Sequence, residues 1–140
     1  MDDFFLRPIQ RTPERLLRPG ENIDHERFLE EVLIPLRRGE LRSYRAFDCG
    51  RMALKEEQRF VQTPVVIVEG SYSCHPSLRE YYDLKIFLDI SPEEQIKRIV
   101  LRNGPAKAEQ FRNKWIPSEE KYHKELKIRE ICELYFHADS

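Results

Sequence analysis

The chain has 140 residues, which suits a single domain with one hydrophobic core. Its 24 basic and 25 acidic residues leave a net charge of −1, so no overall electric field attracts nucleic acid or a membrane surface. We therefore expect one domain, residues 1–140, whose partner is a small molecule.

The sequence contains no apolar run of about 18 residues, and its first residues lack the apolar segment of a signal peptide. Cys49, Cys74 and Cys132 are odd in number and lack Cys-x-x-Cys spacing, which argues against a disulfide framework or a zinc site built on them. These features predict a cytoplasmic protein with reduced thiols, and they are compatible with a homo-oligomer.

The first half of the chain combines a loop, a helix and a strand. Residues 7–20 are rich in proline and arginine and are expected to form a surface loop. Asp24 precedes a segment, residues 25–36, in which apolar side chains recur every four residues, as in an amphipathic helix that Gly39 would close. Residues 41–47 then suggest a short strand, part of a hairpin.

The second half alternates strands and helices. Residues 64–70 form a β-branched apolar run of the kind that is buried on both faces in a parallel sheet, and residues 84–90 suggest a second strand. Ser91 and Pro92 are typical of a helix start, residues 106–131 suggest one or two helices interrupted near Pro117, and residues 134–136 suggest a final strand. This order predicts an open α/β sheet with flanking helices.

Two groups of acidic residues are candidates for chemistry. Glu69 ends the apolar run 64–70, and a carboxylate at the carboxyl end of a strand can hold Mg²⁺ against a phosphate, although a solvated strand end has the same pattern. Asp24 and Asp48 stand beside apolar or aromatic residues, and their carboxylates suit the hydroxyl groups of a sugar. For Asp24, a helix N-cap is an equally good interpretation.

Two arginines, Arg98 and Arg102, are spaced i and i+4 on one face of the predicted helix after Ser91. Such a pair can clamp phosphate oxygens, above all if the following loop moves as a lid, although a solvated basic face is the commoner meaning of this pattern.

Taken together, these segments resemble the uridine kinase family of P-loop kinases, in particular its short bacterial nucleoside-kinase members. The resemblance covers nearly the whole chain, in the family's order. Its motifs are Asp2-Asp3-Phe4-Phe5, Ile23-Asp24-His25, Phe47-Asp48, Val68-Glu69-Gly70, residues 83–89 and the arginine-rich residues 97–103.

The resemblance implies ATP-dependent phosphorylation of the 5′-hydroxyl of a nucleoside, with Mg²⁺ as cofactor. Asp2 would be the general base, and Glu69 would hold the metal. Asp24 would bind the ribose, Phe5 and Phe47 would line the nucleoside pocket together with Asp48, and Arg98 and Arg102 would stabilise charge on the phosphates.

The sequence departs from the family at several points. Met52 stands near the position of a family histidine, and Pro105 stands where the family has a lid arginine. No Gly-x-x-x-x-Gly-Lys-Ser or Gly-Lys-Thr motif occurs, so the P-loop and the first strand and helix of the P-loop NTPase-type fold are expected to be missing. The alternatives are therefore a non-catalytic remnant of such a kinase, or another small-molecule P-loop kinase that resembles pantothenate kinase or phosphoribulokinase.

Overall fold

A computed structural model describes residues 1–40, 43–61 and 63–139. The chain clusters into two compact units, Met1–Tyr82 and Asp83–Ser140, and each is described by itself. Together they form a mixed α/β protein with one antiparallel and one parallel pair of strands, which confirms the predicted α/β class at this level.

The first unit begins with short helical turns. These are the 3₁₀ turns Asp2–Phe4 and Pro8–Gln10 and helix α1, Pro13–Leu16. The segment 7–20, expected to be a loop, therefore contains one 3₁₀ turn and one short helix, whose first turns accommodate Pro8 and Pro13 because proline already has a helical φ.

The predicted amphipathic helix is confirmed as three consecutive helical stretches. They are α2, His25–Phe28, a π-helical turn, Leu29–Leu33, and α3, Ile34–Arg37. Asp24 caps α2, since its carboxylate accepts a hydrogen bond from the Arg27 amide at 3.2 Å, and Gly39 has a φ of 71° where the chain leaves α3.

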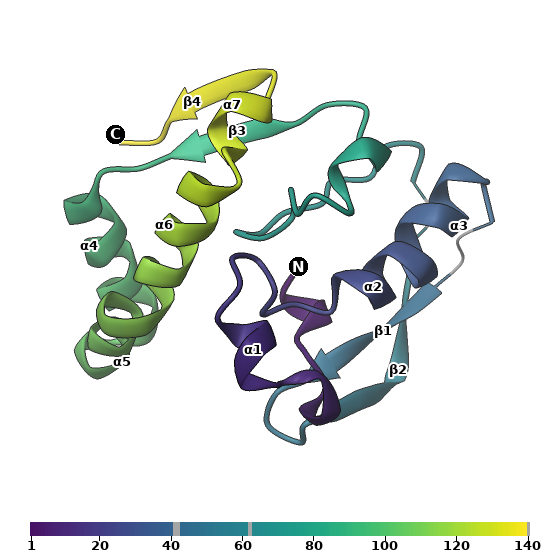
Figure 1. The fold of residues 1–140 in the computed structure, drawn as a ribbon, viewed down its shortest axis with the longest axis horizontal. Helices are drawn as coiled ribbons and strands as arrows, with labels where there is room; N and C mark the ends of the chain where they lie inside the picture. Colours follow the sequence, from purple (N-terminus) through teal and green to yellow (C-terminus); the bar gives the residue numbers. More distant parts are fainter. Residues whose placement is uncertain (41–42, 62, 140) are drawn as a thin grey trace. The chain divides into compact units, whose positions relative to one another are not determined.

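The predicted hairpin is also confirmed (Figure 1). Strand β1, Ser43–Asp48, pairs antiparallel with β2, Ala53–Phe60, and a register shift falls between Arg45 and Phe47. The first two residues of the predicted strand, Leu41 and Arg42, lie outside the described residues.

The strand predicted at residues 64–70 is wrong, because this segment has no regular secondary structure. Val65 is 73% exposed and Ile67 is 85% exposed, while Val66 and Val68 are half-buried, so the apolar run is not buried on both faces. A strand needs a hydrogen-bonded neighbour, and among the described residues no other strand pairs with this segment. The chain then turns through residues 71–78 and a 3₁₀ turn, Arg79–Tyr81.

The core of the first unit gathers side chains from its N-terminal turn, α2 with the following π-helical turn, β1 and the turn 71–78. Phe4 packs edge-on against Phe28, with ring centroids 4.8 Å apart, and also contacts Tyr44. The buried apolar residues are Phe4, Leu6, Ile23, Phe28, Val32, Leu33, Ala46, Phe47, Tyr72 and Leu78.

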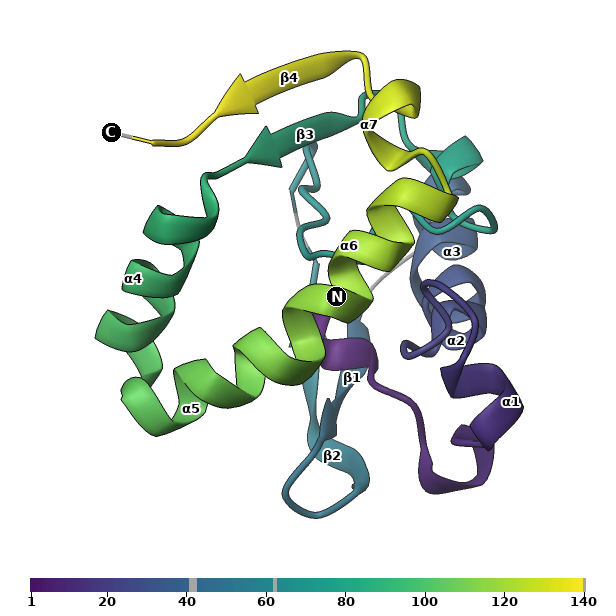
Figure 2. The same ribbon diagram turned by 60° about the vertical axis from the view of Figure 1, so that its left-hand side comes forward.

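In the second unit, strand β3, Ile86–Asp89, pairs in parallel with β4, Leu134–His137, as Figure 2 shows. Both predicted strands are confirmed: β3 is shorter than the predicted span 84–90, and β4 extends one residue beyond the predicted span 134–136. Between them the chain is helical: α4, Pro92–Asn103; α5, Pro105–Gln110; a π-helical turn, Phe111–Trp115; α6, Ile116–Glu125; and α7, Ile128–Ile131.

The helix boundaries of this unit follow local chemistry. The Ser91 hydroxyl caps α4 by accepting a hydrogen bond from the Glu94 amide at 3.4 Å, as the sequence predicts. Pro117 lies in the first turn of α6, directly after the π-helical turn, so the expected interruption is a bulge rather than a break. The helical segment is broken instead between α6 and α7, at Lys127, which has a φ of 51°.

Candidate functional site

The start of the chain lies against the Glu69 backbone. The amino group of Met1 donates a hydrogen bond to the Glu69 carbonyl at 2.5 Å. Gly70 has a φ of 128°, and a Cβ atom there would lie 3.0 Å from Met1 Cβ. Asp2 and Glu69, predicted as general base and metal ligand, therefore belong to two segments in direct contact, and both residues are exposed.

Asp2 also lies within electrostatic range of the end of β1. Burial raises the pKa of the Cys49 thiol above its ordinary value, and the charges of Asp48 and Asp2 add to this effect while Arg11 opposes it. The Asp48 carboxylate accepts hydrogen bonds from the Gly50 amide at 2.8 Å and the Arg51 amide at 3.2 Å, so it also orders the hairpin turn.

Phe5 and Asp24 come together through backbone pairing. Phe5 forms an isolated antiparallel bridge with Ile23, and the Asp24 amide donates to the Phe4 carbonyl at 2.7 Å. Phe5 is half-buried, whereas Phe47 is 5% exposed and belongs to the core.

Asp24 is fully buried. Besides capping α2, its carboxylate accepts a hydrogen bond from Arg7 Nε at 3.1 Å. The structure thus confirms the N-cap interpretation, and the carboxylate is enclosed by its two partners.

Arg98 and Arg102 both lie on α4, in the second unit, and both are exposed. Arg98 binds the Glu94 carboxylate at 3.0 Å and the Ala138 carbonyl at 2.7 Å, while Arg102 Nε donates to Asn103 Oδ1 at 2.8 Å. Both guanidinium groups therefore already have local partners.

A hollow in the first unit lies along the hairpin. Its lining comes from Ala46 and from β2, and none of the residues predicted as site residues lines it. The hollow therefore does not mark the site that the sequence predicts.

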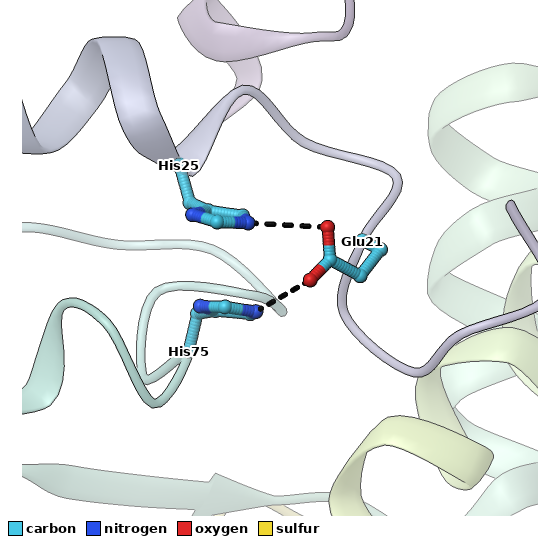
Figure 3. A group of neighbouring side chains, drawn as sticks. All are labelled: Glu21, His25 and His75. Carbon is cyan, nitrogen blue, oxygen red and sulfur yellow. Dashed lines mark hydrogen bonds and ion pairs between the residues drawn. The ribbon is translucent and has the colours of Figure 1, made fainter. Parts of the chain in front are cut away.

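The structure also brings together three residues that the sequence analysis did not select: Glu21, His25 and His75 (Figure 3). Glu21 lies in the turn after α1, His25 is the first residue of α2, and His75 lies in the turn 71–78. His25 Nε2 is 3.2 Å from Glu21 Oε2, and His75 Nε2 is 3.6 Å from Glu21 Oε1. Glu21 and His25 are spaced i and i+4, which is a weak sequence signal of a shared site. Nothing in the sequence connects them to His75, fifty residues after His25.

The two imidazole rings stack with their centroids 3.9 Å apart, and both histidines are buried. Burial, together with the adjacent His25, lowers the pKa of His75 to about 4, although Glu21 and Glu26 oppose the shift. His75 is therefore a neutral imidazole near pH 7.

Arg15 borders this cluster. Its guanidinium group forms two hydrogen bonds with the Glu26 carboxylate, at 2.7 and 2.8 Å, and its Nε lies 3.3 Å from Glu21 Oε2. Partial burial raises the pKa of Glu26, but the hydrogen bond from Arg15 and further interactions outweigh this effect and hold it at about 2. Arg15 and Glu26 are thus an ion pair beside the two histidines.

No protein-family model matches the chain, and no curated protein sequence matches it. None of the helices in the described ranges has the length and apolar character needed to cross a lipid bilayer.

Proposed function

We propose that the protein acts as an ATP-dependent kinase of the P-loop type, which phosphorylates the 5′-hydroxyl of a nucleoside. One observation carries the proposal: the Met1 amine binds the Glu69 carbonyl, which brings the segments of Asp2 and Glu69 together. A general base and a magnesium ligand act on the same phosphoryl group, so they must lie close to each other.

In this proposal Asp2 accepts the proton of the nucleoside hydroxyl while that oxygen attacks the γ-phosphate of ATP. Glu69 helps to hold Mg²⁺ on the phosphates, while the role of Arg98 and Arg102 in neutralising the charge of the transferred group stays a prediction from the sequence. Phosphoryl transfer depends mainly on positioning and on charge stabilisation, so carboxylates, Mg²⁺ and arginines are the groups that it needs.

The nucleoside would bind beside the N-terminal turn, where Phe5 is half-buried and Asp48 ends β1. Asp24 contacts ribose only if Arg7 moves away from its carboxylate. The Arg7 side chain is 47% exposed and can move into solvent, but the Asp24 side chain is 0% exposed, so the ribose hydroxyl groups must replace the hydrogen bond that its carboxylate loses.

The test is transfer of labelled γ-phosphate from ATP to a panel of nucleosides by the protein as its gene encodes it. We expect Asp2→Asn to lower kcat by at least about 100-fold with little change in KM, because general base catalysis contributes about that factor or more. Asp3→Asn is the matched control, since the Asp3 carboxylate already accepts a hydrogen bond from Tyr44 at 2.9 Å. Failure to phosphorylate any nucleoside, or full activity of Asp2→Asn, would contradict the proposal. Pantothenate and ribulose 5-phosphate belong in the panel, because phosphorylation of either would favour the related kinases.

One observation favours a second candidate, a non-catalytic binding protein: the sequence has no Gly-x-x-x-x-Gly-Lys-Ser or Gly-Lys-Thr motif. That loop supplies most of the backbone amides and the lysine that grip the phosphates of ATP. Calorimetry with ATP and Mg²⁺ on the 140-residue chain separates the two candidates, since tight binding would exclude the second.

A further inference from the structure

In the cluster of Glu21, His25 and His75, both imidazole rings have Ser77 on one side and Glu21 on the other. Ser77 Oγ lies 3.0 Å from His25 Nδ1 and 2.8 Å from His75 Nδ1, while the opposite ring nitrogens face Glu21 at 3.2 and 3.6 Å. The Nε2 atoms of the two rings therefore converge on one carboxylate group, and the three candidate ligand atoms lie within 4.8 Å of one another.

A cation between Glu21 and the two rings would contact both Nε2 atoms and the carboxylate at once. Both imidazoles then carry their proton on Nδ1 and donate it to Ser77 Oγ, whose two lone pairs accept both bonds. Both Nε2 lone pairs become free to bind the cation together with the Glu21 carboxylate. A hydrogen bond from the second ring nitrogen of a histidine is the usual way in which proteins fix a metal-binding tautomer.

We propose that Glu21, His25 and His75 form a binding site for a divalent transition metal ion of the zinc type. The proposal is independent of the kinase activity and of its Mg²⁺. Two imidazole nitrogens and one carboxylate oxygen are a ligand set that suits Zn²⁺, whereas Mg²⁺ prefers oxygen ligands alone.

The geometry fits this ion after small side-chain rotations. Tetrahedral zinc with bonds of about 2.1 Å requires ligand atoms about 3.4 Å apart. The candidate atoms, one from each residue, all lie within 4.8 Å of one another, and the two Nε2 atoms lie 3.2 and 3.6 Å from separate oxygens of the Glu21 carboxylate. The fourth coordination position is left for water or another ligand.

The surroundings offset part of the charge of the ion. Glu21 and Glu26 are anionic, and Glu26 Oε2 lies 3.7 Å from His25 Nδ1, while Arg15 contributes one positive charge and binds both carboxylates. The side chains of His25, His75 and Glu21 are only 11, 9 and 17% exposed, which limits competition by water.

Binding shifts one proton within His75. The Ser77 amide now donates to His75 Nδ1 at 3.2 Å, which places the proton of a neutral His75 on Nε2. When the ion occupies Nε2, this proton moves to Nδ1, where Ser77 Oγ accepts it, and the amide contact is given up. The bound ion joins the turn 71–78 to the start of α2.

The experiment is a calorimetric titration of the metal-free 140-residue chain with ZnCl₂. We expect one Zn²⁺ per chain, and a loss of affinity of about 100-fold in Glu21→Gln and His75→Gln, since each removes one ligand. Ser77→Ala should lose about tenfold, because it acts only through the two rings. MgCl₂ in place of ZnCl₂ should give no comparable binding.

Two control variants exclude other zinc ligands. His137→Gln removes a histidine of the second unit, and Cys74→Ser removes the thiol next to His75. Both should bind Zn²⁺ as the unsubstituted chain does. Absence of zinc binding, unchanged affinity in Glu21→Gln, or loss of binding in Cys74→Ser would overturn the proposal.

A second measurement needs no variant and therefore does not depend on how the variants fold. In ¹H–¹⁵N spectra of the four histidine side chains, Zn²⁺ should shift the Nε2 signals of His25 and His75 and convert His75 to the Nδ1–H form. Shifts confined to His123 or His137 would contradict the site.

Discussion

Arg27 holds its guanidinium carbon 4.2 Å from the centre of the Phe4 ring. The side chain is 4% exposed, and it donates hydrogen bonds to the Arg45 carbonyl at 2.7 Å and the Asp3 carbonyl at 2.9 Å. A single buried arginine therefore connects α2, the N-terminal turn and β1, the elements that surround the candidate nucleoside site.

We expect Arg27→Ala to lower the free energy of unfolding by about 3 kcal/mol, since it takes the donor from two partly buried carbonyl groups and removes an ion-pair partner of the buried Asp24. Arg27→Lys should lose about 2 kcal/mol, because an ammonium group lacks the planar fork that reaches both carbonyls. Urea unfolding followed by circular dichroism measures both losses. Arg38→Ala, at an exposed position, should change stability by less than about 0.5 kcal/mol. If Arg27→Lys is as stable as the unsubstituted chain, the connecting role of Arg27 is wrong.

Met52 has a φ of 53° in the hairpin turn. This left-handed conformation costs a side-chain-bearing residue about 1–2 kcal/mol, whereas the extra freedom of an unfolded glycine costs about 0.5–1 kcal/mol. Met52→Gly should therefore stabilise the protein by about 0.5 kcal/mol in a thermal unfolding experiment. Arg51→Gly is the control, because Arg51 has no positive φ and should lose stability. A loss of stability in Met52→Gly would show that the methionine side chain contributes more than the strain costs.

The Tyr135 hydroxyl of β4 donates a hydrogen bond to the Asp89 carboxylate of β3. This bond lowers the pKa of Asp89 below its ordinary value of 3.8; burial opposes the shift, and a hydrogen bond from the Ile90 amide adds to it. Because the folded-state pKa is the lower one, the resulting stabilisation is present above pH 3.8 and is lost as the pH falls through the folded-state value.

We expect Tyr135→Phe to raise the pKa of Asp89, as measured by NMR titration of its carboxyl group. The variant should also lose less stability than the unsubstituted chain when the pH falls below about 4. An Asp89 pKa that does not change would mean that the tyrosine is not its main partner in solution.

Local signals allowed several elements to be predicted from the sequence. Asp24 and Ser91 each cap the helix that follows, because their side-chain oxygens lie where a first-turn amide needs an acceptor. The hairpin and the two strands of the second unit followed from short runs of β-forming residues.

Features that depend on distant partners could not be predicted in this way. Residues 64–70 have the composition of a buried strand, but composition does not supply the neighbouring strand that the backbone needs, and Ile67 remains 85% exposed. His75 lies beside Glu21 and His25 only because the folded chain brings distant segments together, and no local sequence pattern encodes such a long-range contact. The roles of Asp2, Glu69, Arg98 and Arg102 in catalysis stay predictions.

The close approach of Gly70 to Met1 sets a limit on variation at residue 70. An added methyl group would meet Met1 N at 3.1 Å as well as Met1 Cβ at 3.0 Å, and the φ of 128° disfavours any residue with a side chain. One carbon atom at this position is therefore enough to push the start of the chain away from residue 69. The spacing between the two acids that we assign to proton and metal chemistry depends on the smallest side chain available.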